Sequence, residues 1–373
     1  MNLTHRKQCI MCKGELETIY KLNKFPIYMG VSTPNVEDKY SDKVFATCKD
    51  CGCIQLEKLI PLDILYNKSH NSAIGKVWEQ HHNQFCDFVK NYTYGNIVEI
   101  GGGNLKVANT LAKNKAVKKI TVFDKFFPFD KKSDKIVLQN TFFDSNLVYE
   151  KLDGIIHTHL IEHLYNPLEQ IKEIADNLKE GALMMFASPL IDEMLKDNYT
   201  NAMNFEHTFL ISEKMVNNIL NHAGMEFVSK KYFSKYSAFF IFRKNMNLDF
   251  KISHDYSNDF NIIKGFFDFH EKEVEKIKSQ IDTDRNNTFI FGAHIFTQYL
   301  LGFGLSEDLF LNILDNDPAK QNNKMYGSKL EVKSPKILKD IEKPLVVLKA
   351  AMYTEEIKKD ILENINPNTR FIL

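Results

Sequence analysis

The most constraining feature of this sequence is a run of three glycines directly after a short apolar stretch. Residues 96–100 predict a strand, Gly101, Gly102 and Gly103 follow at once, and residues 105–112 predict a helix. Glycines at such a turn let a ligand approach the backbone at a helix N-terminus. The alternation continues, and it predicts an α/β fold with a parallel sheet covered on both faces. Further elements are expected as strands over 119–123, 135–138, 153–157 and 182–187, and as helices over 72–90 and 168–178.

The chain has 373 residues, which is long for one domain, and we divide it into three. The boundaries are 1–70, which contains most of the cysteines, 71–245, which contains the glycine run, and 246–373. The last domain begins with a charged stretch over 249–280 that is expected to be helical and then returns to alternating strands and helices. Its strands are predicted over 288–291, 310–314 and 345–348, and Gly292 and Ala293 form a turn after the first.

The charge balance excludes some functions. Lysine and arginine total 48 residues, and aspartate and glutamate also total 48. The chain therefore lacks the basic excess typical of nucleic-acid-binding proteins. Its apolar runs are shorter than the ~20 residues of a membrane-spanning helix, and its first residues lack the apolar core of a signal peptide. We expect a cytoplasmic enzyme with neither nucleic-acid nor membrane partners.

Two pairs of cysteines predict a metal site. Cys9 and Cys12 form one pair and Cys48 and Cys51 the other, with two residues between the thiols of each pair. Four thiolates in two such pairs match tetrahedral zinc and complete its coordination, so a structural metal is expected. The long insert between the pairs predicts a small subdomain. Cys53 is an alternative to Cys51, although the spacing favours Cys51; reduced thiols without metal are the other alternative.

The glycine run favours S-adenosylmethionine over a dinucleotide. A dinucleotide fingerprint needs a glycine three positions after Gly103, where Lys106 stands. Glu99 before the run instead resembles the acidic residue in the first motif of class I methyltransferases. Asp124, at the end of the next strand, can accept both ribose hydroxyls. A purely structural turn is the alternative. Further predicted cofactor contacts are Thr141 and Phe142 at the adenine, and His157 and His159 at the methionine end.

A histidine-rich segment follows the fourth predicted strand. His157, His159, Glu162 and His163 lie where carboxyl ends of parallel strands face a ligand crevice. Each histidine could instead be an ordinary core or surface residue. His159 and His163 could also bind a catalytic metal if the segment were helical.

Glu206 and His207 follow the fifth predicted strand. A carboxylate beside an imidazole can orient the ring and raise its basicity. His207 is therefore the predicted general base and His163 the second candidate. A polar loop without a chemical role is the alternative.

Together these motifs resemble the sugar C-methyltransferase family, three-domain enzymes that bind zinc and methylate sugars attached to a nucleotide. The resemblance covers nearly the whole chain: it includes both cysteine pairs, CGCIQL, VEIGGG, IEHL, FEHTFLIS, FIFGAHI, ILDNDPAKQ and SPKIL. It implies an α/β fold with a class I methyltransferase sheet of Rossmann-like type, an N-terminal zinc-binding domain and a second Rossmann-like domain. It also implies that His207 is the base, that His163 lines the sugar site, and that the last domain encloses the nucleotide without binding a dinucleotide.

The chain departs from this family at the acceptor site. The family has two tyrosines and paired serines ahead of the first helix. Of the two tyrosines only Tyr66 is present here, with His70 or a neighbour in the place of the other, and the tyrosine that usually precedes the Glu-His pair is replaced by Phe205. An enolate formed during carbon methylation needs hydrogen-bond donors such as tyrosine. Oxygen methylation needs only a base and an aligned hydroxyl. The missing tyrosines therefore favour a sugar hydroxyl over a carbon beside a ketone, and a non-catalytic binding protein is the alternative from another class. Predicted substrate contacts are Tyr66, His70, Asn71, Ser72, Gly292 and Ala293.

Overall fold

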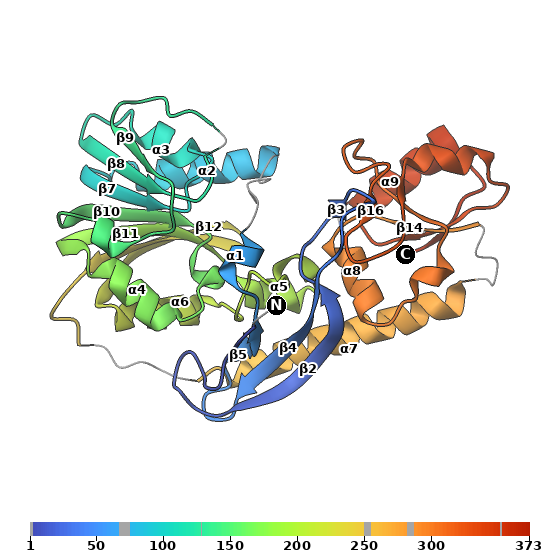
Figure 1. Ribbon diagram of the computed structural model, residues 1–373, viewed down its shortest axis with the longest axis horizontal. Helices are drawn as coiled ribbons and strands as arrows, with labels where there is room; N and C mark the ends of the chain where they lie inside the picture. Colours follow the sequence, from blue (N-terminus) through green and yellow to red (C-terminus); the bar gives the residue numbers. More distant parts are fainter. Residues whose placement is uncertain (1–2, 67–74, 128, 250–254, 282–286, 351–352) are drawn as a thin grey trace. The chain divides into compact units, whose positions relative to one another are not determined.

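Figure 1 shows a computed structural model of the chain, which describes residues 3–66, 75–127, 129–249, 255–281, 287–350 and 353–373. The predicted substrate residues His70, Asn71 and Ser72 lie outside these ranges. The chain forms two compact units: the first is Met1–Glu17, Ala46–Met194 and Glu206–Phe260, and the second is Thr18–Phe45, Leu195–Phe205 and Asn261–Leu373. The division into three domains at residues 70 and 245 stays a prediction.

The first unit is built around one seven-stranded sheet. Its strands are β7 (Gly95–Ile100), β8 (Val117–Phe123), β9 (Ile136–Gln139), β10 (Leu152–Thr158), β11 (Leu178–Pro189), β12 (Met225–Ser234) and β13 (Ser237–Lys244). They are arranged in the order β12-β13-β11-β10-β7-β8-β9. The five strands from β11 to β9 are parallel. The apolar run Ala182 to Ala187 in β11 is buried throughout, which is typical of a strand that is covered on both faces.

Helices cover both faces of this sheet (Figure 1). On one face lie α2 (Lys76–Val89) and α3 (Lys106–Leu111), and on the other α4 (Pro167–Ala175) and α6 (Glu213–His222). The core beneath α2 and α3 contains Phe85, Leu111, Ile97 and Ile156. Each such side chain contributes ~1.5–3 kcal/mol when fully buried. This core therefore stabilises the strands whose carboxyl ends carry the site residues.

The sheet is mixed, which corrects the prediction of a wholly parallel one. β13 runs antiparallel to β11, and β12 runs antiparallel to β13. No strand was predicted between residues 187 and 245, where β12 and β13 lie. The run Phe239 to Phe242 in β13 is apolar at every position, so it shows neither the alternation of a half-buried strand nor the periodicity of an amphipathic helix. Most other boundaries move by a residue or two, but β11 begins at Leu178, where a helix was predicted to end.

The second unit has a sheet of five parallel strands in the order β17-β15-β14-β18-β19. Their bounds are Thr288–Phe291 for β14, Asn312–Leu314 for β15, Val332–Lys333 for β17, Leu345–Leu348 for β18 and Arg370–Ile372 for β19. The strands predicted over 288–291 and 345–348 are confirmed. The helices here are α7 (Ser257–Gln280), which begins in the first unit, α8 (Ile295–Gly302) and α9 (Thr354–Asp360).

The cysteine-bearing segment consists mainly of strands. They are β1 (Thr4–His5), β2 (Leu16–Pro26), β3 (Val31–Ser32), β4 (Tyr40–Cys48), β5 (Ile54–Leu56) and β6 (Lys58–Leu59), followed by helix α1 (Leu62–Leu65). The remaining elements are α5 (Ile191–Lys196), β16 (Lys324–Met325), the 3-10 turns Ser145–Leu147, Ile161–His163, Thr200–Ala202, Glu307–Leu309 and Pro335–Asp340, and a π-helical turn, Ile361–Ile365. Within the described ranges, every helix is too short or too polar to span a membrane.

Candidate active site and metal cluster

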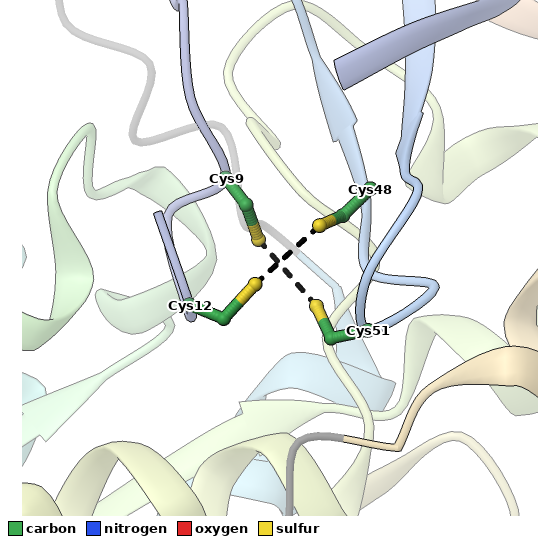
Figure 2. A group of neighbouring side chains, drawn as sticks. All are labelled: Cys9, Cys12, Cys48 and Cys51. Carbon is green, nitrogen blue, oxygen red and sulfur yellow. Dashed lines mark hydrogen bonds between the residues drawn. The ribbon is translucent and has the colours of Figure 1, made fainter. Parts of the chain in front are cut away.

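Four cysteines converge in the first unit, as their spacing predicted (Figure 2). The Sγ atoms of Cys9 and Cys51 are 3.6 Å apart, and those of Cys12 and Cys48 are 3.4 Å apart. All four sulfurs lie within 4.8 Å of one another. Zn–S bonds of ~2.3 Å would place the sulfurs of a tetrahedron ~3.8 Å apart. The cluster can therefore hold a metal ion.

The backbone shapes both cysteine pairs into similar turns. The amide of Lys13 donates to the carbonyl of Cys9 (3.0 Å), and the amide of Gly52 donates to that of Cys48 (2.9 Å). Gly52 has a φ of +76°, a conformation that favours glycine. Cys53 is fully buried, but the group of four ligands found among the described residues includes Cys51 and not Cys53.

The glycine run at the end of β7 is required partly by packing. A Cβ atom on Gly102 would lie 2.4 Å from Cδ of Glu99, and one on Gly103 would lie 2.7 Å from Cγ of Asp124. A Cβ on Gly101 would meet nothing within 4 Å, and this residue has a φ of +77°. Gly101 therefore borders open space, whereas Gly102 makes room for the carboxylate of Glu99, and Gly103 for the backbone oxygen of Phe126 and the carboxylate of Asp124.

Those carboxylates differ in their surroundings. Glu99 is 2% exposed, and its Oε2 atom has no hydrogen-bond partner among the residues that the structure describes. Burial raises the pKa of Glu99 to about 8, although a hydrogen bond with the backbone of Ala108 opposes the shift. Asp124 accepts hydrogen bonds from the amides of Gly103 and Phe126, both at 2.9 Å. The orphaned oxygen of Glu99, together with the space beside Gly101, fits a ligand that carries a positive charge.

His157, within β10, and His159, just after it, lie in different surroundings. His157 is fully buried and stacks on Phe186 at 4.7 Å between ring centroids. Within the described part of the chain, neither of its ring nitrogens has a hydrogen-bond partner. Burial lowers its pKa to about 3. This position suits packing, so its cofactor contact stays a prediction. His159 follows the strand with a φ of +56°, and its ring lies 5.2 Å from that of Trp78.

Glu162 is the electrostatic centre of the histidine-rich segment. It is fully buried, and its Oε1 atom lies 3.2 Å from Nδ1 of His159 and 3.8 Å from Nε2 of His163. Burial raises the pKa of Glu162, but the hydrogen bond from His159 and the charges of His163 and His207 outweigh it and hold the pKa at about 2. Glu162 is therefore an ionised carboxylate inside the protein.

The structure brings the predicted bases together. The ring centroids of His163 and His207 are 5.0 Å apart, and Nδ1 of His163 lies 3.8 Å from Oε2 of Glu206. The hydroxyl of Tyr66 is 2.9 Å from the same Nδ1 atom. Nitrogen or oxygen atoms of Glu162, His163 and His207 all lie within 4.8 Å of one another. Three other predicted catalytic or substrate-binding residues thus lie around His163: Glu206, His207 and Tyr66.

The proposed metal pair His159 and His163 does not form as predicted. A helix would align positions i and i+4, but the left-handed conformation of His159 and the short 3-10 turn Ile161–His163 interrupt the backbone there. Glu162, His163 and His207 form the group with ligand geometry instead.

The remaining predicted residues lie in two places. Thr141 and Phe142 follow β9, where Phe142 is 42% exposed and its ring lies 6.0 Å from that of Tyr66. Gly292 and Ala293 belong to the second unit. The amide of Ala293 donates to Asp315 (2.9 Å), and Gly292 has a φ of +103° with open space at its Cβ position.

Two residues near the site carried no sequence signal. Arg6 is 9% exposed and donates to the carbonyl oxygens of Leu164 and Thr208. These residues directly follow His163 and His207 in the chain. Burial lowers the pKa of Arg6 to about 10, so it stays charged at neutral pH. His81 on α2 is 3% exposed, with its ring 5.2 Å from that of His159. A count of apolar positions on the predicted helix could not single it out.

Comparison with known proteins identifies the central part of the chain. Residues 77–230 match a family described as a methyltransferase domain. A search of curated proteins found no match. Solved structures with a similar fold include a candidate S-adenosylmethionine-dependent methyltransferase from Listeria monocytogenes, with 10% identity over 44% of this chain and 97% of that one and a TM-score of 0.37. An O-methyltransferase family protein from Burkholderia thailandensis has 11% identity over 46% of this chain and 57% of that one, with a TM-score of 0.36.

At these identities and TM-scores the structural likeness carries no argument about function. The family match spans β7, the glycine run, Asp124 and the histidine-rich segment after β10. It coincides with the sheet whose orphaned carboxylate and open glycine fit a cationic cofactor. The chain is an S-adenosylmethionine-dependent methyltransferase.

Proposed function

We propose that this methyltransferase acts on the sugar of a nucleotide-activated sugar and that its acceptor is a hydroxyl oxygen. The proposal is carried by the meeting of His163 and His207 beside the carboxylates of Glu162 and Glu206. A hydroxyl is a weak acid, so a positioned base must take its proton during methyl transfer. The nucleotide-linked sugar itself is supported by the sequence resemblance.

The residues at the end of β7 fit the cofactor. When bound, S-adenosylmethionine supplies an electrophilic methyl group on a sulfonium. Glu99 would receive the cofactor's ammonium group at its unpartnered Oε2 atom. Asp124 would accept from the ribose hydroxyls, because each of its oxygens keeps a lone pair beyond the bond to Gly103 or Phe126.

His207 is the proposed general base. An imidazole can accept a proton near neutral pH, and this ring is partly buried beside that of His163. The ionised carboxylate of Glu162 stabilises the imidazolium formed when one of these rings takes the proton. His163, held by Tyr66 at Nδ1, orients the acceptor oxygen.

One observation favours carbon methylation as the second candidate. The hydroxyl of Tyr66 is held 2.9 Å from Nδ1 of His163, and a fixed phenol can donate a hydrogen bond to an enolate oxygen. In this reaction the base would remove a proton from the carbon beside a ketone. The two candidates therefore share the base and differ in the acceptor atom.

We also propose that the metal of the cysteine cluster is zinc and that its role is structural. Tetrathiolate sites are typical of Zn²⁺, and four protein ligands leave no position for a substrate. The distances between the sulfur atoms support this assignment.

The test is a panel of nucleotide sugars incubated with protein and S-adenosylmethionine, followed by mass spectrometry. One added methyl group on the sugar supports the proposal, and NMR of the product assigns oxygen or carbon. Incubation in D₂O without S-adenosylmethionine separates the candidates, because an enolate that cannot be methylated takes a deuteron back at the carbon beside the ketone, whereas deprotonation of a hydroxyl puts no deuterium on carbon. Calorimetry of cofactor binding completes the design: the absence of any binding would favour the non-catalytic alternative, and binding without transfer to any sugar would refute the acceptor class.

A further inference from the structure

The guanidinium of Arg6 joins segments of the first unit that lie far apart in the sequence. Its Nη1 atom donates to the carbonyl oxygens of Leu56 (3.2 Å) and Thr208 (2.5 Å). Its Nη2 atom donates to the carbonyls of Tyr165 (2.7 Å) and Leu164 (3.4 Å) and to Oγ1 of Thr208 (3.0 Å). These acceptors come from the cysteine-bearing segment and from both loops that carry the candidate catalytic histidines.

Two acceptors are the immediate chain neighbours of those histidines. Leu164 follows His163, and Thr208 follows His207. The two loops are also tied to each other, because Oγ1 of Thr208 donates to the carbonyl of Leu164 at 2.6 Å. The backbone conformation of a histidine sets the direction of its ring. A shift of the Leu164 or Thr208 carbonyl therefore moves the ring of the adjacent histidine.

The network also includes the cysteine-bearing segment. β5 follows Cys51 and pairs with the His207 loop: the amide of Leu56 donates to the carbonyl of Thr208, and the amide of Leu210 to that of Ile54, both at 2.9 Å. Gln55, between those two β5 residues, is 1% exposed. Its Oε1 atom accepts from the amide of Ile10, within the first cysteine pair, at 3.0 Å.

We propose that Arg6 is a positioning residue for methyl transfer, and that through it the cysteine-bearing segment holds His163 and His207 in place. The inference rests on the proposed function for the chemical role of the two histidines. A planar guanidinium suits this task because its rigid fork holds five N–H donors in one plane, whereas an ammonium has three donors on a single nitrogen and cannot make all five of these bonds. The acceptors of Arg6 are neutral carbonyls and a hydroxyl, so what it provides at the loops is geometry.

The test compares Arg6→Gln, Arg6→Lys and Thr208→Val with Glu169→Gln in the full-length protein. Glu169→Gln is the matched control: it breaks the 2.7 Å ion pair between Lys13 and Glu169, which links the first cysteine pair to α4 without involving the histidine loops. The Arg6 variants are expected to fold, because the Thr208 carbonyl keeps its bond from an amide and the Leu164 carbonyl keeps its bond from a hydroxyl. Thr208→Val removes the shared hydroxyl at nearly constant volume and is the second variant.

The first readout is NMR of the histidine rings, which needs no substrate. In all three network variants the signals of His163 and His207 should shift or broaden, while those of His222 and His294 stay unchanged. Metal content and cofactor affinity should stay within about twofold of the wild type. Turnover on the accepted substrate should fall ~10–100-fold, the cost of displacing a reacting group by up to ~1 Å. Arg6→Lys should not restore it, and Glu169→Gln should behave as wild type.

Unchanged signals of both histidines in Arg6→Gln and Thr208→Val would overturn the proposal. A parallel loss of metal, cofactor affinity and turnover would also overturn it, because the network would then support the fold rather than the site. If the wild type methylates no nucleotide sugar, the proposed function fails, but the histidine signals still decide whether Arg6 sets the positions of the rings.

Discussion

Replacing Cys51 with serine should strip the metal from the cysteine cluster, whereas replacing Cys53 should leave it bound. Both thiols are buried, at 5% and 0% exposure, and both follow Cys48 on the same turn. The two variants therefore carry the same chemical change in similar surroundings. They differ in one respect: Sγ of Cys51 belongs to the group of four in Figure 2, and that of Cys53 does not.

The size of the effect follows from the geometry. The paired sulfurs are 3.6 and 3.4 Å apart, within a few tenths of an ångström of the ~3.8 Å edge of a zinc tetrathiolate, so all four bonds can form with little rearrangement. Structural zinc is held by ~10–16 kcal/mol in zinc-finger peptides. If the four thiolates share this evenly, losing one removes ~2.5–4 kcal/mol, which is ~10²–10³-fold in affinity.

The assay is metal content per chain by mass spectrometry, after dialysis against chelators of graded strength. Wild type and Cys53→Ser should retain about one zinc per chain at a chelator strength that empties Cys51→Ser. Cobalt substitution adds an optical check, because a tetrahedral tetrathiolate gives intense visible absorption. Metal loss from Cys53→Ser but not from Cys51→Ser would refute the ligand assignment. A fully folded wild type without metal would refute the site.

Three further outcomes are expected. Asp124→Ala should weaken cofactor binding by ~1.5–3 kcal/mol in calorimetry, and unchanged affinity would contradict its place at the ribose. His207→Ala should lower turnover ~10²–10⁴-fold with cofactor affinity preserved; if His163→Ala has this effect instead, the roles are reversed. The pKa of Glu99 is raised to about 8 from 4.5, so stability contributed by its neutral carboxyl is fully present below pH 4.5 and lost as pH rises through 8. A cationic cofactor favours the ionised form, so binding below pH 8 should release a proton, measured by calorimetry in buffers of different ionisation enthalpy; no release would contradict contact with Glu99.

The sequence predicted the central elements well where local pattern and burial agree. β7 and the glycine run were recognised because an apolar strand, a turn that only glycine fits and a helix follow one another without interruption. The β12–β13 hairpin was missed because a strand buried on both faces, such as Phe239 to Phe242, lacks an alternating pattern. The cluster of four cysteines was recognised because two cysteine pairs of short spacing, a pattern typical of tetrathiolate metal sites, are visible along the chain.

The candidate site was only partly predictable, because its geometry comes from segments far apart in sequence. His163 and His207 were each singled out by the polar neighbours they have in the chain, and the fold places their rings 5.0 Å apart. Nothing in the sequence marks Arg6, since a lone arginine in a polar stretch is ordinarily a surface residue. Its role becomes visible only once its acceptors at Leu56, Leu164 and Thr208 are brought together.

Ligand approach, for which the glycine run was predicted, is only part of the physical reason for three glycines; packing is the other part. Ligand approach explains Gly101, whose Cβ position is open. Gly102 is required by the side chain of Glu99, and Gly103 by the backbone oxygen of Phe126 together with the carboxylate of Asp124. A Cβ on Gly102 would displace the carboxylate of Glu99, and a Cβ on Gly103 would press on both the Phe126 backbone and the Asp124 carboxylate. Alanine at either position should therefore disturb the cofactor site from inside the protein, through Glu99 or Asp124, and alanine at Gly101 through backbone strain at its positive φ. The motif is thus a packing unit in which neighbouring atoms require glycine at 102 and 103, while Gly101 leaves its Cβ position open to a ligand.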